Sequence, residues 1–152
     1  MGRKRGFTLV EVITVTLIVS VLTRIALPQM HEVRVRARAA SVRADFDIVR
    51  GAAQNYHADN FSWPNDMDAG VTPPTLLEYL PDGYSFDRGD YLLNWENWIL
   101  PNGLPNDPST RAVIGVSVTT DDRALGAAVL DMINEAASYQ LGNTYTFIFE
   151  VS

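Results

Sequence analysis

The chain has 152 residues, of which 47% are hydrophobic and 20% are charged, and its formal net charge is −6. A chain this apolar buries enough surface to offset the entropy of folding, which excludes global disorder, and its length suits one domain with an appendage. The lack of cysteine excludes disulfides, thiolate nucleophiles and cysteine-ligated zinc, and the acidic balance argues against general nucleic-acid binding.

Charge is distributed unevenly along the chain. Residues 1–6 carry three basic side chains and no acid, and residues 7–58 carry six arginines against four acids. Residues 59–152 carry three arginines against fourteen acids. The chain therefore divides into a basic tip, a near-neutral stem and an acidic head.

The first apolar segment, residues 7–27, predicts a membrane-spanning helix. Fourteen of its 21 residues are apolar, and only Glu11 and Arg24 are charged. As a helix it is about 30 Å long, which matches the hydrocarbon core of a bilayer. A cleaved secretory signal fits poorly, because an arginine and Pro28 stand where small residues should mark the cut. A plain membrane anchor has no use for Glu11.

The segment RKRGFTLVE, residues 3–11, is the strongest motif of the chain. Three basic residues precede Gly6, Phe7 follows it, and Glu11 lies four positions after Phe7. The segment resembles the class III signal of type IV pilins and type II secretion pseudopilins. In that family the leader is cut after the glycine on the cytoplasmic side, and the new N-terminal residue is N-methylated. The resemblance implies cleavage between Gly6 and Phe7, with N-methylation of Phe7.

The chemistry of these residues suits such processing. Glycine lets the backbone enter a protease cleft in an extended form, and cleavage frees an amine on Phe7. A carboxylate in lipid costs several kcal/mol unless it is paired. The resemblance implies that Glu11 pairs with the Phe7 amine of a neighbouring subunit during filament growth. It also matches Pro28 to the proline that ends the membrane half of the stem, where we expect a kink or local loosening after Arg24.

Arg24 departs from the apolar run that is usual in this family. Its guanidinium either reaches lipid headgroups at the outer interface or forms an additional ion pair between subunits of a filament. It does not reach Glu11 of its own chain, because thirteen residues of helix separate the two by about 20 Å.

The outer half of the stem predicts an amphipathic helix that ends near Asp59, before Trp63-Pro64. Its apolar residues recur at spacings of four and three: Val35, Ala39, Val42, Phe46, Val49, Ala53 and Tyr56. On the other side Arg36, Arg43 and Arg50 recur every seven residues, and Asp47 is spaced to bridge the last two. These arginines form either a solvated face with weak pairs or contacts with the acidic heads of neighbouring subunits.

The head predicts a small antiparallel sheet with one helix. After a connector rich in proline and glycine at 65–83, strands are expected at 91–100, 111–119 and 144–151, with a helix over 121–137. Laid on the outer stem, this sheet would bury the apolar stripe from Val42 to Tyr56. The expected fold is therefore α+β: a long N-terminal helix packed on a small antiparallel head, as the resemblance also implies.

Metal and cofactor sites receive little support from the sequence. His31 and His57 lie about 39 Å apart on a straight helix, so they do not share a metal ion within one chain. Five aspartates in turns either hold calcium in the head or serve turn formation and solubility: Asp66, Asp68, Asp82, Asp87 and Asp90. No cofactor is predicted, and calcium remains an alternative.

The features together predict a structural subunit rather than an enzyme. The expected organisation is a leader (1–6), a transmembrane and filament-core half-helix (7–28), an amphipathic half-helix (29–60) and a globular head (61–152). The subunit would span the inner membrane once, with its N-terminus in the cytoplasm and its head outside, before it joins a filament.

Its expected partners are related pilin subunits, the prepilin peptidase, an inner-membrane assembly platform and the lipid bilayer, with nucleic acid only in a DNA-uptake pilus. The alternative function is a membrane-anchored binding or enzymatic head on an uncleaved signal anchor.

Overall fold

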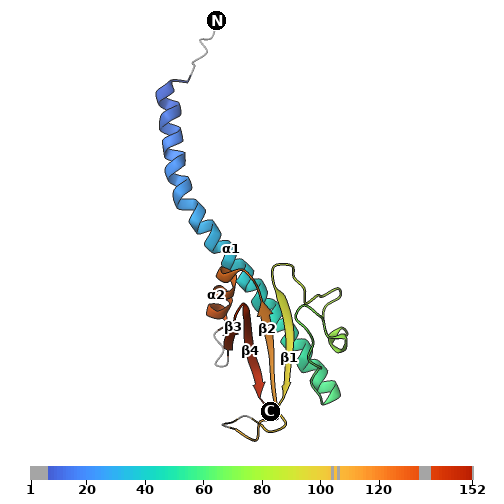
Figure 1. Cartoon of the computed structure of the whole chain (residues 1–152). Coiled ribbons are helices and arrows are strands. Elements are labelled where there is room, and N and C mark those ends of the chain that lie inside the picture. Colours follow the sequence, from blue (N-terminus) through green and yellow to red (C-terminus); the bar gives the residue numbers. More distant parts are fainter. Residues whose placement is uncertain (1–6, 104, 106, 134–137, 152) are drawn as a thin grey trace.

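The computed structural model describes residues 7–103, 105, 107–133 and 138–151, and it shows a long helical stem that carries a small head (Figure 1). Helix α1 (Leu9–Asn60) forms the stem. The head contains the 3-10 turn η1 (Pro74–Leu76), β1 (Leu92–Ile99), β2 (Ala112–Thr119), α2 (Arg123–Met132), β3 (Ser138–Leu141) and β4 (Thr144–Val151).

Both ends of α1 are capped by local interactions. At the start, the Thr8 side chain accepts the backbone N–H of Glu11, which is a preferred N-cap arrangement. At the end, Phe61 adopts a left-handed conformation with φ of 54°, and its N–H donates to the His57 carbonyl at 2.8 Å. The expected end near Asp59 is therefore confirmed.

Helix α1 runs without interruption through residues 24–28, so the local loosening expected before Pro28 does not occur in this structure. Figure 1 shows that α1 bends between its free N-terminal half and the half that lies on the head. The side chain of Pro28 lies outside the part of the chain that the structure describes, and the assignment of the bend to this proline stays a prediction.

The sheet is antiparallel throughout, with the strand order β1-β2-β4-β3 and a β-bulge between Ile114 and Gly115. The three predicted strands are confirmed within a residue or two at each end. The edge strand β3 was not predicted. The predicted helix over 121–137 is too long, because α2 ends at Met132 and residues 134–137 lie outside the described residues.

The core lies between the sheet and the outer half of α1. The predicted stripe faces the sheet, and Val42, Phe46, Val49 and Ala53 are fully buried, whereas its end residues Val35 and Tyr56 are half-buried. The ring of Phe46 meets that of Phe147 edge-on with centroids 5.8 Å apart. Burial of each large apolar side chain contributes about 1.5–3 kcal/mol, so this contact fixes the head on the stem. The expected α+β architecture is confirmed.

Candidate functional site

The N-terminal half of the stem is an apolar helix that nothing in the described structure covers. Every residue from 7 to 27 is exposed, and the large apolar side chains among them are between 51% and 85% exposed. Among the described residues, α1 is the one helix long and apolar enough to cross a membrane. A surface of this kind requires lipid or other protein chains around it.

A capping box closes the N-terminal end of this helix around Glu11. The backbone N–H and the hydroxyl of Thr8 both donate to Glu11 Oε2 at 2.9 Å, and the Glu11 N–H donates to Thr8 Oγ1 at 3.3 Å. No described residue donates to Oε1, which leaves this oxygen available to another group. We did not predict the role of Thr8, although the spacing Thr-x-x-Glu is the sequence signal of a capping box.

The structure shows where the other residues singled out in the N-terminal half of the stem lie. Phe7 is 85% exposed and directly precedes the capping residue. Gly6 lies outside the described residues, so the expected cleavage site is only half described. Arg24 is exposed within the apolar band, about 20 Å along the helix from Glu11. The structure therefore brings Phe7 and Glu11 to one end and keeps Arg24 apart from them.

A second polar cluster joins the stem to the head around Asp45, a buried residue of α1 that is 6% exposed. Its carboxylate accepts Arg88 Nε at 2.9 Å, the Tyr91 hydroxyl at 2.5 Å and the Tyr84 hydroxyl at 3.0 Å, and it also contacts Arg88 Nη2. Burial, together with this carboxylate, raises the pKa of both tyrosines, so they remain protonated donors. The sequence offered no signal for this cluster, because its partners lie about forty residues away.

Arg38 makes a further connection between stem and head. It pairs with Asp90 at 2.7 Å and with Asp122 at 2.9 Å, and these carboxylates, Asp90 first, raise the pKa of its guanidinium. Asp122 also caps α2, and hydrogen bonds from the backbone N–H groups of Leu125 and Ala124 lower the pKa of its carboxyl. The end of the head that faces the free half of the stem is therefore held by ionic contacts.

The arginine face of the outer stem forms pairs within the chain. Arg36 pairs with Glu32 at 2.7 Å, and Arg43 pairs with Asp47 at 3.2 Å. The guanidinium of Arg50 lies over the ring of Phe149 at 5.2 Å from its centroid. The pairs of Arg36 and Arg43 match the first alternative for this face, a solvated face with weak local pairs.

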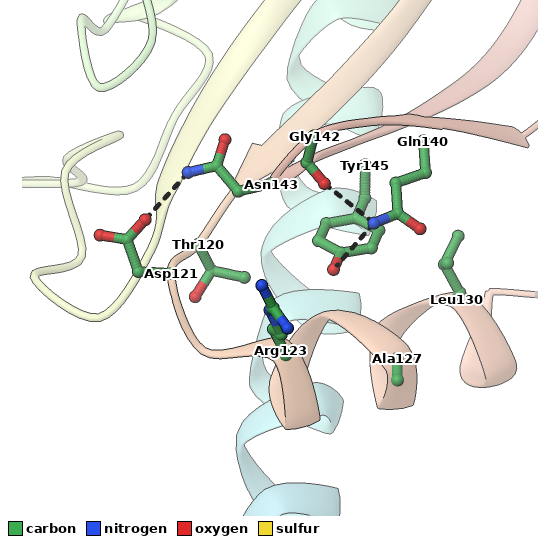
Figure 2. Close-up of a pocket in the computed structure, with 9 residues that line it drawn as sticks. All are labelled: Thr120, Asp121, Arg123, Ala127, Leu130, Gln140, Gly142, Asn143 and Tyr145. Atoms are coloured by element: carbon green, nitrogen blue, oxygen red, sulfur yellow. Dashed lines mark hydrogen bonds between the residues drawn. The ribbon is translucent and has the colours of Figure 1, made fainter.

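The head contains a cleft of about 650 Å³ between α2 and the β3–β4 hairpin (Figure 2). At one side Asn143 donates to Asp121 at 2.9 Å. At the other side Gln140 donates to the Gly142 carbonyl at 2.9 Å and contacts the Tyr145 hydroxyl at 3.4 Å. The side chains of Asn143 and Gln140 are therefore already hydrogen-bonded within the chain at the two sides of the cleft.

The described residues show no cluster suited to a metal ion. No three histidine, cysteine, aspartate or glutamate side chains among them come close enough together to hold one, and this includes the five turn aspartates considered for calcium. His57 instead stacks on Trp63 with ring centroids 4.1 Å apart.

Comparison with known proteins finds one family model and several relatives. Residues 1–23 match the family model of the prokaryotic N-terminal methylation motif. The chain is 29% identical over 111 residues to type II secretion system core protein G of Klebsiella pneumoniae, and the match covers 71% of each chain.

Two further relatives match over a shorter span. Core protein G of Escherichia coli strain K12 is 27% identical over 54% of this chain and 61% of its own length. The type IV major pilin protein PilE1 of Neisseria gonorrhoeae is 32% identical over 47% of this chain and 44% of its own length. No solved structure matches this chain. The chain thus carries the prokaryotic N-terminal methylation motif and is similar to type II secretion system core protein G and to type IV major pilin proteins.

Proposed function

We propose that this chain is a structural subunit of a helical filament, made as a precursor whose leader, residues 1–6, is cut after Gly6. Phe7 then becomes the N-terminal residue and is N-methylated. The match of residues 1–23 to the methylation motif supports both steps. The mature chain consists of a membrane and filament-core half-helix (7–28), an amphipathic half-helix (29–60) and a head (61–152).

The observation that carries this proposal is a carboxylate at the end of an uncovered apolar helix. Glu11 lies in the first turn of α1, where its Oε2 accepts two hydrogen bonds from Thr8 and its Oε1 accepts none from a described residue. In lipid or in a filament core this carboxylate needs a cationic partner. The methylated amine of Phe7 in a neighbouring subunit has the required charge, because methylation keeps an amine basic.

The membrane holds the subunit before assembly. The apolar band of α1 spans the bilayer once, with the N-terminus in the cytoplasm where the peptidase motif is read, and the head on the other side. The peptidase and an inner-membrane assembly platform are the partners of this stage. The match to type II secretion core protein G covers 71% of both chains, whereas the match to PilE1 covers about half, which favours the secretion branch.

Mass spectrometry of the mature N-terminus tests the processing steps. We expect a chain that begins at Phe7 and carries one added methyl group when the gene is expressed in a strain with an active prepilin peptidase. A chain that begins at Met1 or Gly2 in that strain would refute the proposal. A peptidase-deficient strain is the control, in which the intact precursor is expected.

The variant Glu11→Val tests the assembly role separately. This variant is expected to be cut like the wild type, because the peptidase site is unchanged, but to yield no filaments in sheared-cell fractions. Glu32→Val is the matched control, since it makes the same change on the same helix beyond the apolar band and should leave the filament yield unchanged. Normal filament yield from Glu11→Val would remove the ion pair from the mechanism.

The alternative function is a membrane-anchored binding or enzymatic head with an uncleaved signal anchor. The cleft between α2 and the β3–β4 hairpin is the observation that favours it, since a ligand would have about 650 Å³ there. The homologues are structural subunits, which supports a chain without catalytic activity. An uncleaved N-terminus together with a ligand bound in this cleft would establish the alternative.

A further inference from the structure

The face of the sheet that points away from α1 carries a row of polar and aromatic side chains. Along β1, Leu93 and Trp95 are fully buried in the core against α1. Because side chains alternate along a strand, Asn94, Glu96 and Trp98 point to the opposite face. Figure 1 shows α1 along one side of the sheet and no helix over the other.

Glu96 is the most unusual residue of this face, because it is a carboxylate that is only 9% exposed. Its Oε1 accepts the hydroxyl of Ser117 at 2.5 Å and the side-chain amide of Asn94 at 3.0 Å. Within the described ranges no arginine, lysine or histidine pairs with this carboxylate, and no group donates to its Oε2. Among the described residues, the carboxylate is therefore contacted only by neutral donors, both of them on Oε1.

Asn94 adds a second acceptor without a partner. Its Oδ1 is buried and receives no hydrogen bond, while its amide nitrogen is directed to Glu96. The register places Asn94 in one row with Ser117, Thr146 and Tyr139 across all four strands. Asn94 Oδ1, next to Glu96 on this face of the sheet, thus lacks a donor, which is rare for a buried polar atom.

Two aromatic side chains lie on this face of the sheet. Trp98 follows Glu96 by two residues on the same face and is half-buried, and Tyr139 is 45% exposed. Their ring centroids lie 6.3 Å apart with an interplanar angle of 41°. An aromatic face next to a carboxylate is the surrounding that a guanidinium prefers, because the rings attract its charge while the carboxylate accepts its N–H groups.

A guanidinium satisfies this site better than other cations. It brings the missing positive charge and five donors in a planar group that stacks on an aromatic ring, which an ammonium does less well. Calcium requires six to eight oxygen ligands, and this face offers few oxygens beside two aromatic rings. A buried carboxylate without a cation is unfavourable, because it has lost hydration without gaining a partner. This desolvation cost is already present in the free subunit, so it does not have to be met again when an arginine binds.

We propose that the outer face of the sheet is a docking site for an arginine side chain of a partner protein, held by Glu96 and stacked on Trp98. The site lies on the opposite side of the head from the stem, so it stays accessible when the stem is covered. This inference is independent of the proposed filament function.

The binding of a minimal probe tests the site directly. The full-length chain, labelled with ¹⁵N in detergent micelles, is titrated with N-acetyl-arginine amide and separately with the neutral isostere N-acetyl-citrulline amide. We expect saturable shifts of the Trp98 indole N–H and the Asn94 side-chain amide with the arginine probe, with a dissociation constant on the order of 1 mM. The citrulline probe should cause no saturable shift.

Variants separate a docking role from a structural one. Glu96→Gln should weaken the arginine probe at least about tenfold without lowering the melting temperature, because it removes an uncompensated buried charge. The control Glu78→Gln changes an exposed acid of the head and should leave binding unchanged.

Three results would overturn the proposal. The first is equal response to the two probes, and the second is full binding by Glu96→Gln. The third is saturation of the site by calcium or by self-association of the chain, which would assign the carboxylate to another occupant.

Discussion

Removal of the Asp45 carboxylate is the most demanding test of how the head is held on the stem. The variant Asp45→Ala deletes the acceptor of Arg88, Tyr91 and Tyr84 at once. Loss of one partner of a buried ion pair costs about 3–5 kcal/mol, because the other charge stays uncompensated. The Arg88 side chain is 31% exposed and hydrates in part, which places the expected loss near the lower limit, at about 3 kcal/mol.

The matched control lies two residues away on the same helix. Asp47 also pairs with an arginine, but its side chain is 53% exposed and its partner Arg43 is 35% exposed. Exposed pairs of this spacing contribute about 0.3–0.5 kcal/mol. Asp47→Ala should therefore have almost no effect on the stability of the head, although it removes the same functional group.

Thermal unfolding of the full-length chain in detergent, followed by tryptophan fluorescence, measures both variants. Trp95 is fully buried in the core and reports the loss of the packed head. At about 4 °C per kcal/mol for a unit of this size, Asp45→Ala should lower Tm by about 12 °C and Asp47→Ala by about 2 °C or less. Equal shifts for the two variants, or a shift below about 4 °C for Asp45→Ala, would refute the reasoning.

Two further predictions concern α2, the first with a control variant on α1. A Cβ at Gly126 would lie 2.1 Å from the Tyr145 hydroxyl, so Gly126→Ala should lower Tm. Gly51 lies in open space on α1, so Gly51→Ala should raise the free energy of unfolding by up to about 1 kcal/mol and raise Tm accordingly. Equal Tm changes of the two variants would contradict the contact. Hydrogen bonds, of which that from the Leu125 N–H is the strongest, lower the pKa of the Asp122 carboxyl. The ionised carboxylate therefore stabilises the folded head fully above about pH 4, and this stabilisation is lost as the pH falls through the lowered pKa. Asp122→Asn should therefore flatten the decline of Tm below pH 4, and an unchanged acid profile would contradict this.

The helical stem and the three longer strands were predictable because each has a local signal, which is aromatic composition for residues 91–100 and periodicity for the others. The stripe from Val35 to Tyr56 repeats with the helical period, and residues 111–119 and 144–151 alternate with the period of a strand. Strand β3 carries no such signal, because its four residues are all exposed and the strand exists through its pairing with β4. The helix over 121–137 was overestimated for a related reason, since no glycine or proline follows Met132 up to residue 137 to mark its end.

The candidate sites divide in the same way. Glu11 and Phe7 belong to one short motif, so both can be recognised from the sequence alone. Asp45 and Glu96 take their meaning from partners that are 43 and 21 residues distant, and a lone acid in a helix or strand looks like an ordinary solvated residue. Thr8 is recognisable by its spacing from Glu11, because Thr-x-x-Glu is the pattern of a capping box.

The ionic contacts of the head also bear on what holds the proposed filament together. The uneven charge of the chain suggested that stem arginines meet the acidic heads of neighbouring subunits. In the structure Arg38 already pairs with two head acids, and Asp45 of the stem already pairs with Arg88 of the head. These charges are used within one chain, so they add little to contacts between chains.

The exposed apolar half of α1, by contrast, has no partner among the described residues. Transfer of each large side chain of this band out of water is favourable by about 1.5–3 kcal/mol. In the proposed filament, several such side chains of each subunit would pack against neighbouring stems. In the membrane the same side chains already rest in lipid, so transfer into a filament core yields little of this energy. In the proposed filament, packing between stems and the proposed pairing of Glu11 with a neighbouring amine would then decide assembly. For this reason we expect Glu11 alone to matter more for assembly than the whole arginine face.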